Sequence, residues 1–215
     1  RMPHAMIFAG PGGIGKATMA FRFARSLLKK GAEDQSGGGL FGGEDAGVTS
    51  LHVAPDDPVF HKVASGGHPD FLAIERQVDD RKGRLKTSVD VESVRKVTPF
   101  LRMTAADGGW RVVLIDDADT MNRNAQNALL KILEEPPDNA VLILIAHRPG
   151  ALIPTIRSRC RVISFHPLGE ADMDAVLSRA GGADLSAAER ETLAAIANGC
   201  PGAAVTLMEE GGLDA

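Results

Sequence analysis

The sequence lacks several features that would assign a protein to a class at once. Tyrosine is absent, one tryptophan is present and aromatic residues total only 4%, so a surface that stacks single-stranded bases is not expected. Its two cysteines, Cys160 and Cys200, lie far apart and outside any Cys-x-x-Cys pattern, which excludes a disulfide framework or zinc ribbon. The longest apolar run, residues 140–146, is far shorter than the roughly 20 residues of a membrane span. We therefore expect a cytoplasmic protein without a membrane segment.

The overall composition is that of a globular protein. Of the 215 residues, 44% are hydrophobic and 24% are charged, which suits one moderate domain or two small ones. The net charge is −4, whereas proteins that bind DNA tightly by themselves usually carry a basic excess. One local basic stretch contains Arg76, Arg81, Lys82, Arg84 and Lys86. We interpret this stretch as a solvated hairpin, with a contact to DNA phosphates as the alternative.

Hydrophobic periodicity divides the chain into two expected domains. Residues 1–166 alternate aliphatic strands with amphipathic helices, a pattern typical of a parallel sheet covered by helices on both faces. Inside this domain, residues 31–70 are rich in glycine and lack sustained periodicity, which predicts a long flexible loop or a partly ordered insertion. Residues 167–215 show no strand pattern. Three short helices are expected there, near 169–180, 186–198 and 202–210.

The elements of the first domain can be placed approximately. Strands are expected at residues 6–9, 71–74, 112–115, 141–146 and 161–165. Helices are expected over about 16–30, after a cap at Asp90, and over about 123–135, where two prolines stop the last one. This order of strands and helices predicts an α/β fold.

A glycine-rich segment between the first strand and first helix fits the pattern G-x-x-x-x-G-K. Such a loop turns its backbone N–H groups toward phosphate oxygens, while the helix N-terminus and the lysine supply positive charge. The candidate phosphate-binding residues are Gly10, Gly12, Gly13, Gly15 and Lys16. A glycine-rich turn that binds nothing is the alternative, and the strand and helix on either side disfavour it.

The position after Lys16 departs from that pattern. A serine or threonine normally stands there and ligates Mg²⁺, but this chain has Ala17. Thr18 completes the candidate nucleotide-binding set, yet it lies about 100° further round the helix and should not replace the missing hydroxyl. Binding of ATP, ADP or phosphate without hydrolysis is left open.

The strand predicted at residues 112–115 ends in acidic residues. In a phosphate-loop protein, the first of them, Asp116, would hold Mg²⁺ through water. The next, Asp117, stands where many ATPases have a glutamate that polarises the attacking water, and it is one methylene shorter. For Asp119 we expect a solvated turn that caps the following helix.

Two later segments extend the pattern. Residues 127–137 read NALLKILEEPP, in which Lys131 lies within reach of Glu134 and Glu135 on a helix. Residues 158–160 read Ser-Arg-Cys. Together with the glycine-rich loop and the acidic strand end, these segments resemble the clamp-loader family of AAA+ ATPases, in particular its delta-prime branch. The resemblance covers residues 3–207.

The resemblance implies an AAA+ P-loop domain followed by a small three-helix lid domain. It also implies a C-terminal collar domain, which is missing from this sequence, and the abrupt start likewise suggests a piece of a longer chain. A monomeric fragment of an oligomeric parent is therefore compatible with the sequence.

The function implied is a place in a ring-like pentamer that opens the sliding clamp and places it on primed DNA. In this family the arginine of Ser-Arg-Cys reaches into the ATP site of the neighbouring subunit, and here that residue is Arg159. The implied partners are the gamma/tau and delta subunits, the sliding clamp and primer-template DNA. From the residues alone, Arg159 would be interpreted as a member of a surface ion pair. Arg157 is expected to be solvated, and Cys160 to be a small buried side chain and not a nucleophile.

Two positions beyond Ala17 and Asp117 depart from an active ATPase of this family. His147 and Arg148 stand where a small polar residue usually senses the γ-phosphate, and Ala203 stands where a second sensing arginine is expected. Hydrolysis requires metal, activated water and positive charge at the γ-phosphate together. We therefore predict a chain that does not hydrolyse ATP by itself.

Many members of the delta-prime branch carry a four-cysteine zinc module after the first helix. Residues 31–70 contain no cysteine here, and the spacing of His52, His61 and His68 matches no zinc pattern. We expect these histidines to be solvated and predict neither zinc nor any other metal.

The main hypothesis is therefore a non-hydrolysing clamp-loader subunit within the DNA polymerase III holoenzyme. It would lend Arg159 to a neighbour's ATP site. An active gamma/tau-like motor ATPase is the alternative from the enzyme class. A small-molecule phosphotransferase is a third hypothesis, which the Ser-Arg-Cys segment and the helical tail fit poorly.

Overall fold

The computed structural model describes residues 2–35, 50–79, 83–106, 109–182 and 185–210. The chain forms two compact units. The first comprises Arg1–Phe8 and Ala17–Ile163, and the second comprises Ala9–Lys16 and Ser164–Ala215. The sequence predicts a boundary at residue 166 with the phosphate loop in the first domain. In the structure the boundary falls at Ser164, and the phosphate loop belongs to the second unit.

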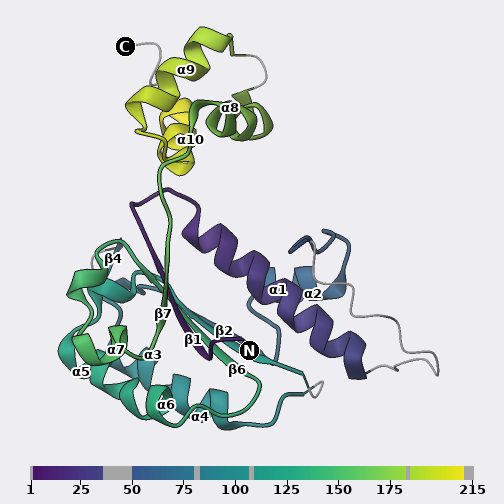
Figure 1. Cartoon of the computed structure of the whole chain (residues 1–215), viewed down its shortest axis with the longest axis vertical. Helices are drawn as coiled ribbons and strands as arrows, with labels where there is room; N and C mark the ends of the chain where they lie inside the picture. The colour runs from purple at the N-terminus through teal and green to yellow at the C-terminus, as the bar shows by residue number, and fades with distance from the viewer. Residues whose placement is uncertain (1, 36–49, 80–82, 107–108, 183–184, 211–215) are drawn as a thin grey trace. The chain divides into compact units, whose positions relative to one another are not determined.

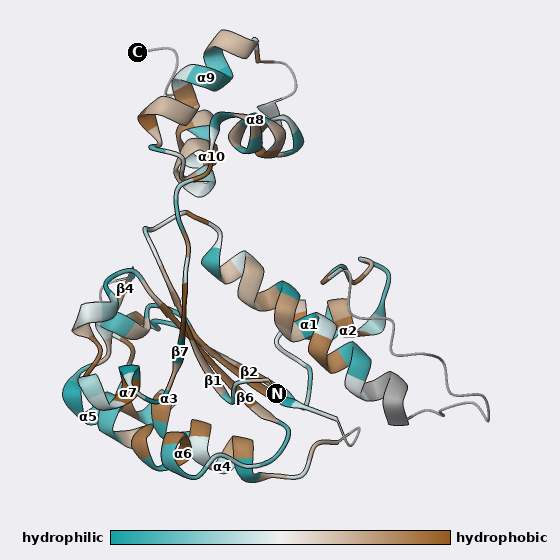
Figure 2. Cartoon of the chain, viewed as in Figure 1, coloured by the Kyte–Doolittle hydropathy of each residue, from teal (hydrophilic) through white to brown (hydrophobic). Residues whose placement is uncertain are grey.

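The first unit is built on a five-stranded sheet in the order β2-β5-β6-β1-β7. Its strands are β1 (Ala5–Ala9), β2 (Phe71–Ile74), β5 (Arg111–Ile115), β6 (Ala140–Ala146) and β7 (Arg161–Ser164). Every residue of β1, β5 and β6 is buried, because helices cover both faces, and these strands therefore read as unbroken aliphatic runs. Figure 2 shows the apolar strands at the centre of the unit. The predicted α/β sheet is confirmed.

The register of the sheet brings together the segments that carry the candidate site. Strand β5 pairs in parallel with both β2 and β6. Ile74 of β2 lies opposite Ile115 of β5, which lies opposite Leu144 of β6. Because parallel strands end at the same edge, the segments that follow β5 and β6 emerge close together.

Helices lie on both sides of the sheet, as Figure 1 shows. Helices α1 (Lys16–Gln35) and α2 (Pro58–Ala64) lie on one side. The other side carries α3 (Val91–Arg95), α4 (Val97–Arg102), α5 (Arg123–Ala128), α6 (Leu130–Glu134) and α7 (Pro154–Arg157). Two short 3₁₀ helices, η1 (Ala118–Thr120) and η2 (Pro149–Ala151), follow β5 and β6.

Two of the predicted helices are each divided in the structure. Asp90 caps α3 as predicted, and its Oδ1 accepts a hydrogen bond of 2.7 Å from the backbone N–H of Ser93. Lys96 then separates α3 from α4. The helix predicted over residues 123–135 is divided at Leu129, whose N–H bonds to the carbonyl of Gln126 three residues earlier, a tighter turn than that of an α-helix.

Of the two alternatives for residues 31–70, the described part fits a partly ordered insertion. Helix α1 continues to Gln35, and α2 forms within the glycine- and proline-rich stretch. Asp57 caps α2 by accepting from the N–H of Val59 at 2.8 Å, and it also pairs with Lys29 of α1 at 2.8 Å. Lys29 and Asp57 lie far apart in sequence, so periodicity could not reveal their ion pair. The predicted flexible stretch at 36–49 lies outside the described residues.

A two-stranded hairpin connects β2 to α3. Its strands, β3 (Val78–Asp79) and β4 (Arg84–Leu85), pair antiparallel, as expected for the basic stretch. Arg84 and Lys86 are exposed to solvent, in agreement with a solvated hairpin. Residues 80–82 lie outside the described part of the chain, and the other arginine of this stretch, Arg76, behaves differently, as shown below.

The second unit contains the three helices predicted for the chain's end. They are α8 (Glu170–Arg179), α9 (Ala187–Ile196) and α10 (Pro201–Glu209). Their buried core consists of Met173, Leu177, Leu193, Ala197 and Ala204. Ser186 and Glu189 form a capping box that fixes the start of α9. None of the helices in the described residues combines the length and apolar character needed to cross a membrane.

Candidate functional site

The glycine-rich loop between β1 and α1 packs against other parts of its own unit. The backbone N–H of Gly202, at the start of α10, donates to the carbonyl of Gly13 at 2.7 Å. Gly13 has a φ of +73°, and a Cβ there would lie 3.0 Å from the backbone nitrogen of Ala203. A Cβ on Gly10 would lie only 2.5 Å from the carbonyl oxygen of Phe165. Two of the motif's glycines therefore serve packing within the fold, whatever they do for phosphate.

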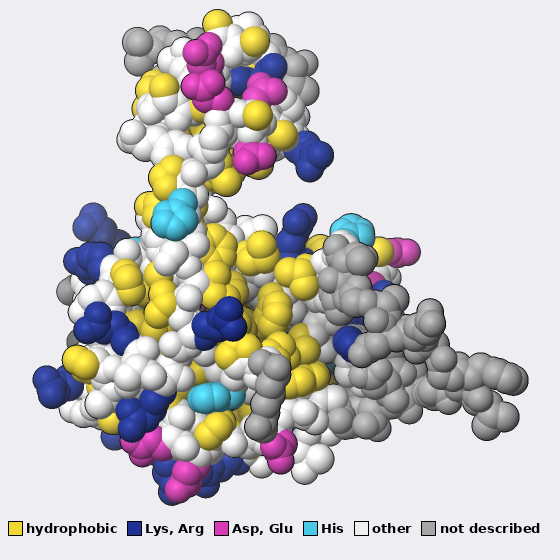
Figure 3. Space-filling view, in the orientation of Figure 1, with side chains coloured by type: hydrophobic (Ala, Val, Ile, Leu, Met, Phe, Trp, Pro, Cys, Tyr) yellow, Lys and Arg dark blue, Asp and Glu magenta, His cyan; other side chains and the backbone are white. Residues whose placement is uncertain are grey.

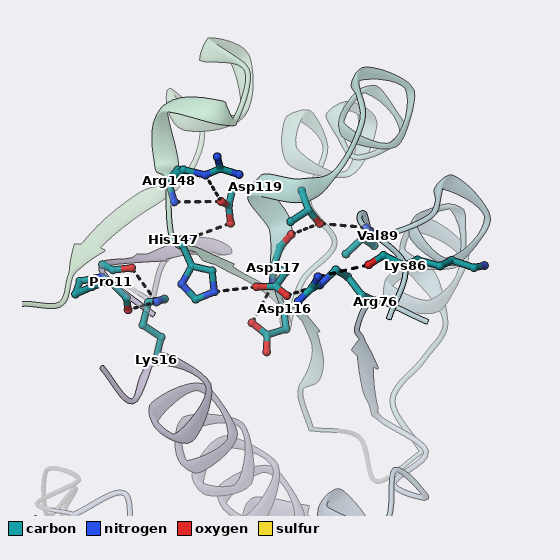
Figure 4. A network of polar contacts seen from close by, with 12 residues as sticks. Pro11, Lys16, Arg76, Lys86, Val89, Asp116, Asp117, Asp119, His147 and Arg148 are labelled. Atoms are coloured by element: carbon teal, nitrogen blue, oxygen red, sulfur yellow. Dashed lines mark hydrogen bonds and ion pairs between the residues drawn. The ribbon is translucent and has the colours of Figure 1, made fainter. Parts of the chain in front are cut away.

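The lysine of the loop is held by the loop itself. Lys16 is buried, and its ammonium donates to the carbonyl oxygens of Gly10 at 2.8 Å and Pro11 at 2.7 Å (Figure 4). In a phosphate-binding loop this charge would face phosphate oxygens. A phosphate group would therefore have to compete with two hydrogen bonds that the loop already makes.

The remaining loop positions leave the metal side of the site incomplete. Gly12 is exposed, and Gly15 has a φ of +97°, a conformation that favours glycine. Ala17 offers no hydroxyl, and Thr18 is exposed on the first turn of α1.

The acidic residues after β5 form a compact network, which Figure 4 shows. Asp117 has a left-handed backbone with a φ of 49°, and its N–H donates to Oδ1 of Asp116 at 2.8 Å. Its Oδ2 accepts from Nε of Arg76 at 2.6 Å. Its Oδ1 lies 2.8 Å from Nε2 of His147. Both carboxylate oxygens of the candidate water-activating residue are thus engaged by the protein's own side chains.

Arg76 corrects the interpretation of the basic stretch. Its side chain is 31% exposed, and besides Asp117 it contacts the carbonyl of Lys86 at 3.4 Å. The guanidinium therefore occupies the Oδ2 atom with which Asp117 could otherwise hold a water molecule. Arg76 is therefore an internal counter-ion and not a solvated member of the hairpin.

Asp119 is also placed differently from the prediction. Its side chain is only 1% exposed and accepts from the backbone N–H groups of His147 at 3.0 Å and Arg148 at 3.2 Å. Burial raises the pKa of this carboxyl, but these backbone hydrogen bonds outweigh burial and hold the pKa below 3.8. The cap of the following helix is Asn122, which accepts from Ala125. Asp119 instead ties the turn after β5 to the segment after β6.

The predicted arginine finger lies at a partly exposed position after α7. The Arg159 side chain is 35% exposed. Its NH1 donates to the carbonyl of Thr155 at 3.1 Å, and its NH2 donates to Oε1 of Glu134 at 3.0 Å. The neighbouring Arg157 is exposed as predicted, while Cys160 is buried, and burial raises the pKa of its thiol to about 12. Cys160 is therefore a packing residue and not a nucleophile.

Gln126 is a residue that the sequence analysis missed. Its buried amide donates to the carbonyl of Met121 at 2.9 Å and to that of Ala151 at 3.3 Å. Its Oε1 accepts from the N–H of Ile153 at 2.7 Å, just before α7 begins. A polar residue on the apolar side of a predicted helix is the one signal that could have found it. Through these bonds Gln126 fixes the segment that leads into α7 and Arg159.

The histidines do not form a metal centre in the described residues. No group of three or more His, Cys, Asp or Glu side chains there could hold a metal ion. His52 and His61 are exposed as predicted, but His68 is buried, and its Nδ1 accepts from the N–H of Asp70 at 3.1 Å. The prediction of a solvated His68 is therefore wrong, because this ring completes a turn before β2.

Comparison with known proteins agrees with this architecture. The family model described as "DNA polymerase III, delta subunit" matches residues 49–169. The DNA polymerase III subunit delta' of Pseudomonas aeruginosa is 38% identical over 157 residues, which cover 73% of this chain and 41% of that protein. The Escherichia coli subunit delta' is 34% identical over 181 residues, covering 78% of this chain and 51% of that protein. The chain thus spans about half the length, or less, of these two relatives.

A structural comparison supports the fold. The Thermotoga maritima RuvB Holliday junction branch migration motor superposes with a TM-score of 0.54 at 18% identity, over 97% of this chain and 53% of that chain. At this identity the likeness shows the fold alone. The family match covers more than half of the residues, and the chain therefore belongs to the DNA polymerase III delta subunit family, with DNA polymerase III delta' subunits among its relatives.

Proposed function

We propose that this chain is a non-hydrolysing clamp-loader subunit that supplies Arg159 to the ATP site of a neighbouring subunit. The observation that carries the proposal is the contrast between an internally occupied phosphate loop and a partly exposed arginine. A guanidinium placed at a γ-phosphate stabilises transition-state charge and accelerates phosphoryl transfer by about 10³–10⁵-fold in systems where it has been measured.

The surface around Arg159 supports an anionic target. Lys and Arg side chains gather over β4, α5 and α7 on the face drawn in Figure 3. Arg123 of α5 and Arg157 of α7 are both exposed. A positive surface of this kind attracts a bound triphosphate and steers its approach.

Three residues of the chain argue against hydrolysis. Ala17 cannot ligate Mg²⁺ through a hydroxyl, Asp117 is engaged by Arg76 and His147, and Ala203 offers no cation. A nucleotide or phosphate bound to the loop would share the Lys16 ammonium with the carbonyl oxygens of Gly10 and Pro11. In this proposal the loop serves mainly to make packing contacts within the second unit.

The proposed setting is a bacterial clamp loader in the cytoplasm. Its partners are gamma/tau and delta subunits, and through the assembly the sliding clamp and primer-template DNA. A gamma/tau-like motor is the second candidate, because the tau subunit of Escherichia coli is 31% identical over 166 residues, 77% of this chain. The substitutions in the pocket favour the non-hydrolysing role.

The direct test is ATP hydrolysis by a reconstituted clamp loader that contains the variant Arg159→Ala in this subunit. We expect DNA-stimulated hydrolysis at the neighbouring site to fall by about 10³-fold. Arg179→Ala, which removes an exposed arginine of α8 in the second unit, is the control and should change the rate less than twofold. Unchanged hydrolysis with Arg159→Ala would refute the proposed role.

A further inference from the structure

The carboxylate of Glu134 lies against the guanidinium of Arg159. Glu134 is the last residue of α6, and its Oε1 accepts from NH2 of Arg159 at 3.0 Å. Sequence spacing predicts that Lys131 pairs with Glu134 or Glu135. Among the described residues, however, Glu134 pairs with Arg159, and Glu135 pairs with Arg102.

The charge of Glu134 has no evident use within its own helix. A carboxylate at the C-terminal end of a helix is disfavoured by the helix dipole. Its side chain is 52% exposed, and ion pairs at such sites contribute little to the stability of the fold. The role of this carboxylate is therefore to be sought in its contact with Arg159.

The geometry leaves Arg159 able to bind a second anion while it stays in contact with Glu134. A guanidinium has five N–H donors, and the structure uses one on NH1 for Thr155 and one on NH2 for Glu134. The remaining donors are enough for a bidentate contact to a phosphate group. Glu134 and the Thr155 carbonyl thus bind the two terminal nitrogens of the guanidinium and leave other N–H donors for a phosphate group.

We infer that Glu134 is a positioning residue that braces Arg159 for the triphosphate of the neighbouring subunit. This inference rests on the proposed function. A long arginine side chain loses much rotamer freedom when it is fixed, and a brace removes most of that freedom before the phosphate arrives. A misplacement of about 1 Å at a reacting centre can reduce the rate by about 10²-fold, so the brace acts on turnover more than on ATP binding.

The test compares two substitutions of Glu134 in a reconstituted clamp loader. Glu134→Gln keeps a hydrogen-bond acceptor at the Oε1 position, whereas Glu134→Ala removes the brace. We expect Glu134→Ala to lower kcat for the neighbour's ATP hydrolysis about tenfold with KM unchanged, and Glu134→Gln to stay within about twofold. Glu135→Ala, at the adjacent exposed carboxylate, is the matched control and should not change kcat. Thermal unfolding of the purified variants checks that each one folds.

A double variant shows whether Glu134 acts through Arg159. In the Arg159→Ala background, Glu134→Ala should have no further effect on kcat, whereas additive losses would overturn the inference. A rise in kcat with either Glu134 variant would mean that the carboxylate holds the arginine away from the phosphate. An equal loss of kcat with both variants would mean that the charge of Glu134, and not its hydrogen bond, matters. Either result would overturn the inference that Glu134 positions Arg159. If Arg159→Ala alone leaves hydrolysis intact, the proposed function fails, and this outcome is distinct from failure of the brace.

Discussion

The phosphate loop and the Ser158–Cys160 segment each carry one basic residue in a recognisable motif, yet the structure places the two charges differently. In the loop, the ammonium of Lys16 is buried and bonded to Gly10 and Pro11. In the segment, the guanidinium of Arg159 is partly exposed and keeps donors for another partner. The difference shows that the charge of one motif can serve contacts within its own loop while the charge of another remains partly exposed at the surface.

The glycines of the loop have a role in packing. Gly10 and Gly13 are needed for close backbone contacts with Phe165 and with the start of α10, respectively. Ala17, by contrast, stands at the position where a hydroxyl would ligate Mg²⁺. The two glycines therefore serve the fold, whereas position 17 lacks a group that hydrolysis would use.

Among the variants near the phosphate loop and the acidic residues after β5, the largest loss of stability is expected for Asp119→Asn. This change removes a buried charge that accepts two backbone hydrogen bonds, so the free energy of unfolding should fall by about 1–3 kcal/mol at pH 7. The pKa of Asp119 is lower in the folded state than its ordinary value of 3.8, so its stabilisation is present above that value and is lost as the pH falls through the folded pKa. Urea unfolding at pH 7 and at pH 3 should therefore show a smaller difference between variant and parent in acid.

The matched control for Asp119 is Asp138→Asn, at an exposed acid before β6. Its effect should lie within about 0.5 kcal/mol at both pH values. If Asp119→Asn behaved like this control, the buried carboxylate would not hold the segments after β5 and β6 together.

A smaller effect is expected for Lys16→Met, which separates the structural role of the loop from a catalytic one. The carbonyls of Gly10 and Pro11 lose a charged donor, so stability should fall by about 1–2 kcal/mol. Hydrolysis by a reconstituted loader should change less than twofold, in contrast to Arg159→Ala. Lys62→Met, at an exposed lysine of α2, is the control for stability. A large loss of hydrolysis with Lys16→Met would show that the phosphate loop, like the Ser158–Cys160 segment, takes part in catalysis.

The smallest effect is expected for Ala17→Ser, which restores the missing hydroxyl. Mg²⁺-dependent phosphate release by the isolated protein should stay at background, because Lys16, Asp117 and Ala203 still depart from an active site. Stability should change by less than about 0.5 kcal/mol. Steady phosphate release after this single change would show that the missing hydroxyl at position 17 alone prevents hydrolysis by the parent protein.

Much of the candidate site could be predicted from local sequence. The strand ends and the loop each lie in one short stretch, so Gly13 and Asp116 were proposed from the pattern, whereas Arg159 was proposed only through the resemblance carried by the Ser-Arg-Cys segment. The partners of these residues could not be found in this way. Asp117 pairs with Arg76 and His147, 41 and 30 residues away, and no periodicity links those positions.

Burial of single polar residues was equally hidden from the sequence. Asp119, Gln126 and His68 look like ordinary surface residues of turns and helices, but all three are buried and hydrogen-bonded. A polar side chain enters a core only when the fold brings backbone donors or acceptors to meet it. That meeting depends on tertiary structure and leaves little trace in the local pattern.

The sequence by itself determined the order of strands and helices, the position of the phosphate loop and the absence of a hydroxyl at Ala17, because each follows from residue types at short spacing. Only the tertiary structure decided which charged side chains bond to groups within the protein and which remain exposed at its surface. Lys16 and Arg159 each carry one positive charge in a recognisable motif, yet Lys16 donates to carbonyl oxygens of its own loop, and Arg159 lies at the surface beside Glu134. The reason is physical: a charge acts on whatever the fold places within hydrogen-bond distance of it.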